Sequence, residues 1–282
     1  MREHPHFLIA GAPRSGTGWM LSCLMEHPEV HVPHREVDYF SYKYDHTTAW
    51  YRDHFSDCEP GQRTGEKSPS YLASSEAPDR IHDWNSDVDL IFSLRHPVER
   101  AYSTWCMMMQ NSRSDLGDDI ERELTPSSGI VKRGRYFEHL QRYRAHFPDE
   151  QIHVLIFDGL KADALQFART LFEAIGVDPN FKPSLLDRKY GNRKKRGGRV
   201  WSQIQEWSLH LTRMSDTAAR LMDWARRQGY TDWVHRMRLG KEYPSLPDAV
   251  RERLNKHYQD DVDRLRSYLG RDLPGWPGNT SA

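Results

Sequence analysis

An α/β fold, with a central and mostly parallel sheet between two layers of helices, is predicted by three short apolar runs that each precede a helical pattern. The runs are Phe7–Ala10, Val88–Leu94 and Ile152–Phe157. Continuous apolar runs of this length are typical of strands that are buried on both faces of a parallel sheet. Strands that alternate with helices predict βαβ units, in which successive strands run in the same direction.

The segments after these strands have the spacing and the end signals of helices. The first predicted helix, Gly16–Glu26, gathers its apolar residues on one face and ends before Pro28, which cannot continue it. Pro97 opens a second helix that runs to about Gln110, because proline suits a first helical turn. A third helix is predicted from about Ala162 to Ile175.

The rest of the chain is predicted to be partly helical and to belong to one domain. Helical spacing recurs in 135–147, 201–228 and 247–269, whereas the polar stretch 112–133 is predicted to be a loop. Because the 282 residues contain no internal repeat and no separating linker, we expect a single domain over residues 1–282. Within it, 192–241 is interpreted as an insertion. A lid, a packed helical pair and the surface of a homodimer all stay open for that insertion.

The composition predicts a globular protein without a general attraction to nucleic acid. Hydrophobic residues make up 37% and charged residues 28%, and 40 Lys and Arg balance 40 Asp and Glu. The balanced charge argues against a nucleic-acid partner, and the lack of a long apolar run argues against a membrane span. Cys23, Cys58 and Cys106 are odd in number and widely spaced, which fits a reducing cytoplasm better than a disulfide framework. We therefore expect a cytoplasmic protein.

A glycine-rich turn, Gly11–Gly18, follows the first strand and makes the predicted three-layer sandwich P-loop-like. Backbone N–H groups of such a turn, together with the N-terminus of the next helix, form an anion site suited to phosphate. Gly11 and Gly16 have the spacing of the P-loop pattern GxxxxGK[ST], but Thr17 stands at the lysine position and Gly18 at the hydroxyl position. Arg14 supplies a cation from within the turn instead.

The missing hydroxyl has a chemical consequence, because that side chain helps to hold Mg²⁺ in phosphoryl-transfer enzymes. The second strand ends in Arg95, at a place where such enzymes can carry a Mg²⁺-binding aspartate. No histidine pair has the HExxH spacing of a metal site. The site is therefore predicted to bind anions with protein cations and no metal, which disfavours a kinase and favours transfer of the less charged sulfuryl group.

The turn and the second strand carry two motifs of one enzyme family. "GAPRSGTGWM" resembles the 5′-phosphosulfate loop of sulfotransferases that use 3′-phosphoadenosine 5′-phosphosulfate (PAPS), and "LIFSLRHPVERAYSTW" resembles their 3′-phosphate motif. The second resemblance implies that Arg95 and Ser103 hold the 3′-phosphate, and the family implies the sulfotransferase fold and adenosine 3′,5′-bisphosphate as the product. The first resemblance implies that the donor is bound by Arg14, Ser15, Gly16, Thr17, Gly18 and Trp19.

Two further stretches resemble the heparan-type carbohydrate branch of that family and its bacterial relatives. "HREVDYF" is similar to the segment with the catalytic glutamate, which implies Glu36 as general base. "GEKSPSYL" is similar to the segment whose lysine reaches the active site, which implies Lys67. His34 would share a strand face with Glu36 and either tune it or line the cleft. Arg14 is expected to act as an electrostatic clamp rather than as an acid.

A basic run, Arg188–Arg199, contains seven cations in twelve residues. The resemblance covers most of 7–188 and 243–276 but is weak over 192–241, where only the basic character matches a loop that covers the donor. Arg193, Lys194 and Arg196 are the candidate donor-binding residues in it. A disordered charged loop and a nucleic-acid patch are the alternatives, and the balanced net charge argues against the second.

The resemblance implies in-line transfer of a sulfuryl group from PAPS to a hydroxyl, or secondarily an amine, of a small molecule or saccharide. A nucleotide or small-molecule kinase, which would need Mg²⁺, stays open as an alternative. So does a non-catalytic nucleotide-binding protein, which would bind the bisphosphate without transfer. Aromatic residues in the predicted cleft segments suit either a stacked acceptor ring or an ordinary core: Trp19, Tyr39, Tyr42, Tyr44, Trp50 and Tyr71.

Overall fold

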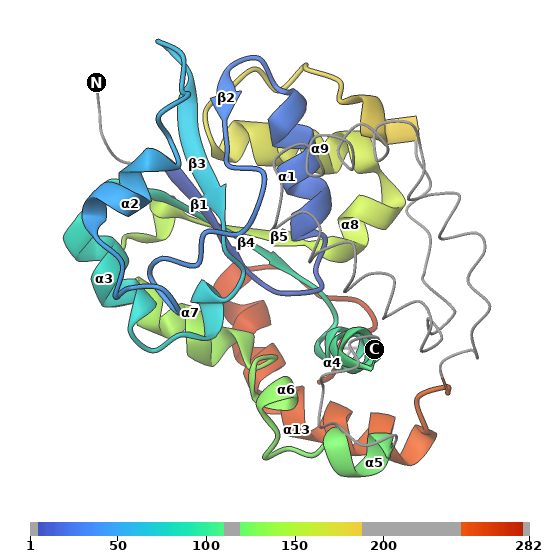
Figure 1. Ribbon diagram of the computed structural model, residues 1–282. Helices are drawn as coiled ribbons and strands as arrows, with labels where there is room; N and C mark the ends of the chain where they lie inside the picture. The colour runs from blue at the N-terminus through green and yellow to red at the C-terminus, as the bar shows by residue number, and fades with distance from the viewer. Residues whose placement is uncertain (1–4, 110–118, 188–243, 279–282) are drawn as a thin grey trace, which may run out of the picture.

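A five-stranded parallel sheet lies at the centre of the protein (Figure 1), in a computed structural model that describes residues 5–109, 119–187 and 244–278. The strands lie in the order β2-β3-β1-β4-β5, and every neighbouring pair is parallel. This confirms the predicted central parallel sheet. The strands are β1 (Phe7–Gly11), β2 (Val30–His31), β3 (Arg63–Lys67), β4 (Asp89–Leu94) and β5 (Ile152–Ile156).

Helices follow the strands at most of the places that the sequence indicates. The helices predicted after the first two strands are α1 (Thr17–Glu26) and α4 (Pro97–Met108), and the patterns in 135–147 and 247–269 form α7 (Tyr136–Arg144) and α13 (Asp248–Leu269). The other helices and 3₁₀ turns of the described residues are α2 (Thr48–Asp53), η1 (Tyr71–Ala73), α3 (Ala77–Trp84), α5 (Ile120–Glu123), α6 (Gly129–Lys132), η2 (Asp149–Gln151), α8 (Phe157–Ala162), α9 (Ala164–Ala174) and η3 (Ser184–Asp187).

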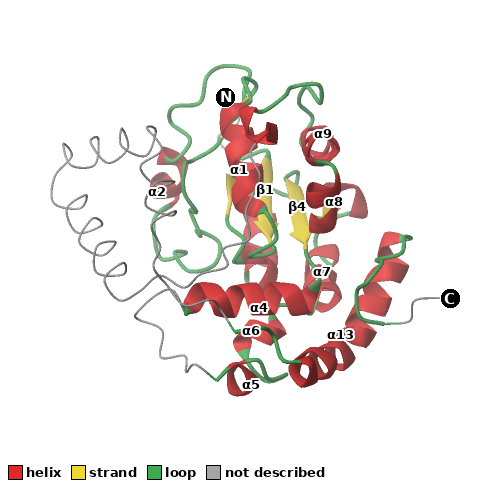
Figure 2. Ribbon diagram, turned by 90° about the vertical axis from the view of Figure 1, so that its right-hand side faces the viewer, coloured by secondary structure: helices red, strands yellow, loops and turns green. Residues whose placement is uncertain are grey.

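The helices cover both faces of the sheet, which confirms the three layers (Figure 1). Successive strand residues point to opposite faces, so Leu8 and Ala10 of β1 join one core cluster while Phe7 and Ile9 join the other. The first cluster packs under α3, α4, α7 and α13, and the second under α1 and α9. Figure 2 shows α4 crossing beside the ends at which β1 and β4 finish, so this helix borders the carboxyl edge of the sheet.

The sequence analysis missed two strands, β2 and β3. β3 has the sequence RTGEK and contains no aliphatic side chain, yet four of its five residues are buried. Its burial comes from β1 and β2, which pair with it on either side, and from the helices above and below. A pattern of apolar residues cannot reveal a strand whose burial is supplied by its neighbours.

The third predicted helix, from about Ala162 to Ile175, is confirmed as α9 (Ala164–Ala174), but the prediction did not include the short helix α8. β5 ends at Ile156, one residue before the predicted end, and α8 begins at Phe157. Asp163 then interrupts the helix with an extended backbone, and its carboxylate accepts the N–H of Gln166 at 2.9 Å, which starts α9. The predicted loop 112–133 was wrong in part, since its described residues include α5 and α6.

Two of the sequence predictions fall on residues that are not described. The helical pattern 201–228 and the basic run with Arg193, Lys194 and Arg196 lie outside the described ranges. Among the helices that are described, none is long and apolar enough to span a membrane.

Asp261 of α13 caps the N-terminus of α7 across the packed interface between the two helices. Its carboxylate oxygens accept the N–H groups of Phe137 and Glu138 at 3.1 and 3.0 Å, and the side chain is only 5% exposed. Arg135, the residue before α7, provides no side-chain cap of its own. The docking of α13 therefore satisfies the first N–H groups of α7.

Replacing Asp261 with alanine should lower the free energy of unfolding by about 1–3 kcal/mol, because two largely buried N–H groups lose their acceptor. Urea unfolding measures this, with Asp260→Ala as the matched control on the exposed side of the same helix. Equal losses of stability in the two variants would contradict the capping role.

Candidate active site

The turn between β1 and α1 exposes the start of a helix at the carboxyl edge of the sheet. Gly16 has a left-handed backbone (φ 84°), and a Cβ there would lie 2.8 Å from the ring of Phe157, so only glycine fits this close approach. Within the described ranges, no side chain caps α1, and a Cβ at Gly18 would meet no atom within 4 Å, so these residues leave the first turn open. These features fit a cradle for a phosphate or sulfate group.

Arg14, Arg95 and Ser103 come together at this turn, although they belong to segments far apart in the chain. Arg14 has a left-handed backbone (φ 67°), and its Nε donates to Ser103 Oγ at 3.1 Å. Arg95 follows β4, and its Nη1 donates to the carbonyl of Arg14 at 3.4 Å. The structure thus joins the two sequence motifs, with two cations and a hydroxyl beside the start of α1.

Arg95 is a largely but not fully buried cation, and no carboxylate of the described residues makes a close ion pair with it. Its side chain is 17% exposed, its nearest carboxylate is Glu99 at 3.9 Å, and Tyr136 donates to its carbonyl at 2.7 Å. Burial lowers the pKa of Arg95 from its ordinary value. Among the described residues its Nε has no hydrogen-bond partner. A buried guanidinium with donors to spare suits a bound anion.

Glu36 and Lys67 form an ion pair on the other side of β1. Lys67 ends β3 opposite Ile9 of β1, and its Nζ lies 2.5 Å from Glu36 Oε1. The Lys67 side chain is 11% exposed and that of Glu36 48%, so the carboxylate can be reached from solvent. Residues 34–38 do not form a strand, so the prediction that His34 and Glu36 share a strand face was wrong.

Residues 4–266 match the family described as the sulfotransferase domain. The chain belongs to this family.

Known sulfotransferases resemble the chain in sequence and in fold. It is 33% identical over 159 residues to human heparan sulfate glucosamine 3-O-sulfotransferase 3B1, covering 54% of this chain and 40% of that protein. It is 28% identical over 191 residues to the human 3-O-sulfotransferase 5, covering 64% of this chain and 55% of that protein. The chain therefore spans about half the length of these curated relatives. A sulfotransferase from Alicyclobacillus acidocaldarius shares the fold, with a TM-score of 0.70 and 20% identity over 97% of this chain and 98% of that one.

Several predicted donor-binding residues of the sulfotransferase domain have side chains in the core. Trp19 is 3% exposed and packs edge-on against Phe167, with ring centroids 5.9 Å apart. Ser15 and Thr17 are also buried, and the carbonyl of Ser15 accepts from Ser93 Oγ at 2.6 Å. The side chain of Trp19 therefore anchors α1, and what these positions offer to a ligand comes mainly from their backbone.

The predicted cleft aromatics divide into two groups. Tyr39 and Tyr71 are buried in the core, where Tyr39 stacks on Tyr51 at 4.4 Å. Tyr42 and Tyr44 are 67% and 44% exposed, in the stretch that follows Glu36. Trp50 is partly buried, so Tyr42 and Tyr44 present the most aromatic surface to a ligand among these six residues.

The sequence analysis missed Glu66, a carboxylate that is fully buried beside the ion pair. Its Oε1 accepts the hydroxyl protons of Tyr51 and Tyr71 at 3.0 and 2.7 Å, and its Oε2 accepts that of Ser68 at 2.6 Å. Burial raises the pKa of Glu66 to about 7, against the opposing effect of these hydrogen bonds. The signal was present in "GEKSPSY", where a glutamate and three hydroxyl residues lie close together in the chain.

The raised pKa of Glu66 predicts a pH-dependent cost in stability. The pKa of Glu66 rises from an ordinary value of 4.5 to about 7 in the folded protein. Between pH 4.5 and pH 7, the folded protein therefore keeps a proton that the unfolded chain releases. Stability from this group is thus present below pH 4.5 and lost as the pH rises to 7, by roughly 3 kcal/mol. Glu66→Gln cannot ionise. Its unfolding free energy relative to wild type should therefore rise by roughly 3 kcal/mol between pH 4.5 and pH 7.5. Urea unfolding at both pH values tests this, and a constant difference would contradict it.

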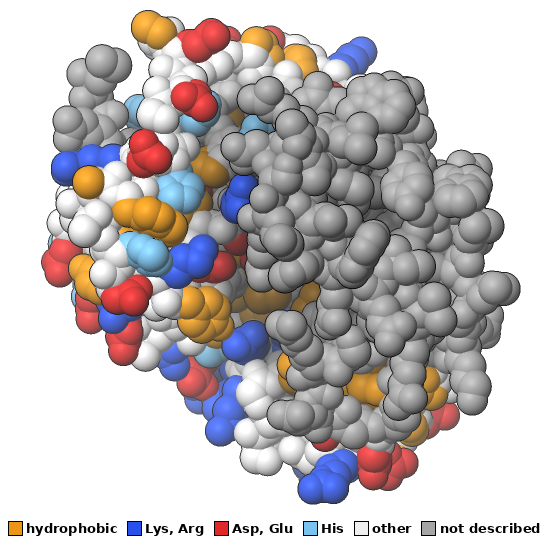
Figure 3. Space-filling view, in the orientation of Figure 1, with side chains coloured by type: hydrophobic (Ala, Val, Ile, Leu, Met, Phe, Trp, Pro, Cys, Tyr) orange, Lys and Arg blue, Asp and Glu red, His pale blue; other side chains and the backbone are white. Residues whose placement is uncertain are grey.

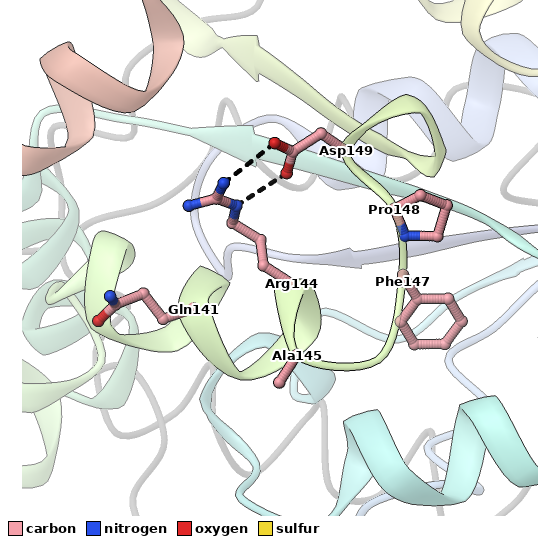
Figure 4. A pocket seen from close by; sticks show the side chains of 6 residues that line it. All are labelled: Gln141, Arg144, Ala145, Phe147, Pro148 and Asp149. Carbon is pink, nitrogen blue, oxygen red and sulfur yellow. Dashed lines mark hydrogen bonds and ion pairs between the residues drawn. The ribbon is translucent and has the colours of Figure 1, made fainter.

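A surface pocket of about 480 Å³ lies away from the candidate active site (Figure 4). Its lining precedes β5 and so lies at the amino end of that parallel strand, opposite the edge that carries the turn. Arg144 and Asp149 face each other in it through hydrogen bonds of 2.8 and 3.0 Å, so their charges are already paired (Figure 4). The pocket is lined by Gln141, Arg144, Ala145, Phe147, Pro148 and Asp149.

Proposed function

We propose that this sulfotransferase domain transfers a sulfuryl group from PAPS to a hydroxyl of a saccharide or small molecule. The observation that carries the proposal is the pairing of Glu36 with Lys67 at the end of β3, one strand away from the turn where Arg14 meets Ser103. An anion cradle and a reachable carboxylate thus lie at the same edge of the sheet.

PAPS, when bound, supplies the sulfuryl group and departs as adenosine 3′,5′-bisphosphate. The start of α1 and Arg14 are placed to hold its 5′-phosphate, where negative charge grows as the bond to sulfur breaks. Arg95 and Ser103 are proposed to hold the 3′-phosphate. The proposed donor site therefore consists of a helix terminus, two guanidinium groups and a hydroxyl, and it needs no metal ion.

Glu36 is proposed to be the general base. An acceptor hydroxyl loses its proton to Glu36 Oε1 or Oε2 as its oxygen attacks the sulfur. Lys67 holds the carboxylate in place and brings a positive charge to the region where the sulfuryl oxygens must lie. His34 is exposed and is proposed to line the entrance.

A saccharide is the acceptor class that the surface beside Glu36 favours. Tyr42 and Tyr44 expose their rings there, and the Arg80 guanidinium lies 4.1 Å from the centre of the Tyr44 ring. Arg133 donates to the Tyr42 hydroxyl at 3.2 Å. On this face Lys, Arg and His side chains lie among hydrophobic and acidic ones around α2 (Figure 3). Rings flanked by cations suit a sugar that carries acidic groups, in keeping with the heparan sulfate named for the relatives.

Radiolabelled PAPS incubated with a heparan sulfate oligosaccharide, 4-nitrophenol and a sterol tests the proposal. We expect label to enter the oligosaccharide and adenosine 3′,5′-bisphosphate to form in equal amount. Bisphosphate binding without label transfer to any acceptor would indicate a non-catalytic nucleotide-binding protein.

Transfer and bisphosphate binding should both survive EDTA, because the proposed clamp consists of protein groups. In the described part of the chain, no group of three or more His, Cys, Asp or Glu side chains is placed to share a metal ion. Titration of the bisphosphate by calorimetry, with EDTA and with Mg²⁺, should give dissociation constants within about twofold of each other. ATP binding that requires Mg²⁺ would instead favour the kinase alternative.

We also propose that the protein acts in a reducing compartment such as the cytoplasm. Cys23, Cys58 and Cys106 are all free thiols. Burial raises the pKa of Cys23 to about 12, which keeps that thiol protonated and unreactive. Thiol titration of the protein, purified without reductant and then unfolded in urea, should find three free groups.

A further inference from the structure

The turn that follows Glu36 is held in an unusual backbone conformation. Asp38 has a left-handed backbone (φ 58°), which costs a residue other than glycine roughly 1 kcal/mol or more. Its carbonyl accepts the N–H groups of Tyr42 and Lys43, both at 3.1 Å. Its carboxylate accepts the hydroxyl of Ser70 at 2.6 Å. A turn of this kind persists only where surrounding groups hold it.

Two hydroxyls connect the backbone of this turn to Glu66. Ser68 Oγ accepts the N–H of Asp38 at 2.8 Å, and the Tyr71 hydroxyl accepts the N–H of Phe40 at 3.3 Å. Each hydroxyl has one proton, and each donates it to Glu66. The carboxylate therefore orients both hydroxyls so that their lone pairs face the turn.

Tyr51 provides an internal contrast to these two hydroxyls. It also donates to Glu66, at 3.0 Å, but among the hydrogen bonds of the described residues it receives no N–H from the turn. The side chains of Glu66 and of all three hydroxyl residues are buried in the same core region. Loss of Tyr51 and loss of Tyr71 therefore remove the same group from similar surroundings, and only one of them releases the turn.

We propose that Glu66 is a positioning residue, which acts through Ser68 and Tyr71 to fix the turn that carries Glu36. The inference rests on the proposed function, in which Glu36 is the base. Glu66 and Lys67 are neighbours in β3 and point to opposite faces of the sheet. The last two residues of β3 thus have different roles: Glu66 holds the turn, and Lys67 pairs with the base Glu36. Both lie beside the loop that follows β2 (Figure 1).

The cost of Glu66 supports a role other than stability. A fully buried carboxylate is expensive to desolvate, and its raised pKa reports that expense. An uncharged side chain of the same size would fold at a lower cost at neutral pH. The hydroxyls would then lose the acceptor that sets their direction.

Kinetics of matched variants test the proposal with labelled PAPS and the heparan sulfate oligosaccharide. Ser68→Ala and Tyr71→Phe should lower kcat about 10- to 100-fold and leave KM for PAPS within about twofold. Ser68→Thr keeps the hydroxyl and should restore most of the turnover. Tyr51→Phe should cost less than about threefold. Tyr258→Phe, which removes a buried hydroxyl bonded to the carbonyl of Val131, should leave turnover unchanged.

Amide hydrogen exchange gives a readout that does not depend on activity. Ser68→Ala should speed exchange at Asp38, and Tyr71→Phe should speed it at Phe40, each about fivefold or more, whereas Tyr258→Phe should change neither. Unchanged exchange at both amides overturns the inference. So do faster exchange with unaltered kcat, and equal kcat losses in Tyr51→Phe and Tyr71→Phe. If wild type transfers no sulfuryl group while the exchange rates change as expected, the proposed function fails and the contact assignment stands.

Discussion

Glu36→Gln should lower kcat for sulfuryl transfer by about 10²–10⁴-fold, the range that a general base contributes. Glutamine keeps the size of the side chain and a hydrogen bond from Lys67, but it cannot take the proton of the acceptor. The dissociation constant of adenosine 3′,5′-bisphosphate should stay within about twofold of wild type, because Glu36 lies on the acceptor side. Initial rates with saturating PAPS and calorimetry with the bisphosphate measure the two quantities.

Glu59→Gln is the matched control for that experiment. It makes the same chemical change at an exposed glutamate in the stretch between α2 and β3, outside the proposed site. Its turnover should equal that of wild type. A Glu36→Gln variant that keeps near-wild-type turnover would show that another group takes the proton.

Arg95→Ala should weaken binding of adenosine 3′,5′-bisphosphate by about 100-fold or more. Hydrogen bonds to charged groups contribute about 1.5–3 kcal/mol each, and a guanidinium can make two to one phosphate. Adenosine 5′-monophosphate lacks the 3′-phosphate, so its binding should fall much less. Calorimetric titration with both nucleotides therefore isolates the proposed contact.

Arg271→Ala is the control for the loss of an arginine outside the proposed site that also donates to a backbone carbonyl. Arg271 donates to the carbonyl of Val154, and burial lowers its pKa as it does that of Arg95. Its loss should leave bisphosphate binding unchanged. Equal losses of affinity for the bisphosphate and the monophosphate in Arg95→Ala would contradict a specific 3′-phosphate contact. Arg95→Lys keeps the charge and should bind more tightly than Arg95→Ala if the variant folds.

The sequence predicts the strands that are buried by their own residues and misses those buried by their neighbours. Phe7–Gly11, Asp89–Leu94 and Ile152–Ile156 are apolar throughout or nearly so, and their patterns locate β1, β4 and β5 to within a residue. β3 is polar and lies between β1 and β2. Only pairing partners far away in the chain reveal it, and a local pattern does not contain them.

The candidate site divides in the same way. Motif spacing brings Arg95 and Ser103 to the glycine-rich turn, because a residue that ends one strand and another on the next helix must lie near that strand end. Motif likeness alone indicates Glu36 and Lys67, and their direct ion pair becomes visible only in the structure. Neither motif spacing nor motif likeness indicates Glu66, because a carboxylate is ordinarily expected at the surface and this one is buried.

The order of the strands has a consequence for how such a protein can change over time. The proposed base, its lysine partner and the two exposed tyrosines come from segments before residue 73, joined to β2 and β3 on one side of β1, while Arg80 and Arg133 reach the same surface from later segments. The residues proposed to bind the 3′-phosphate of the nucleotide, Arg95 and Ser103, lie in 95–103. This stretch follows β4, which is on the opposite side of β1 from β3. Substitutions in the segments before residue 73 can therefore change most of the acceptor surface without altering the residues of 95–103 that are proposed to bind the nucleotide.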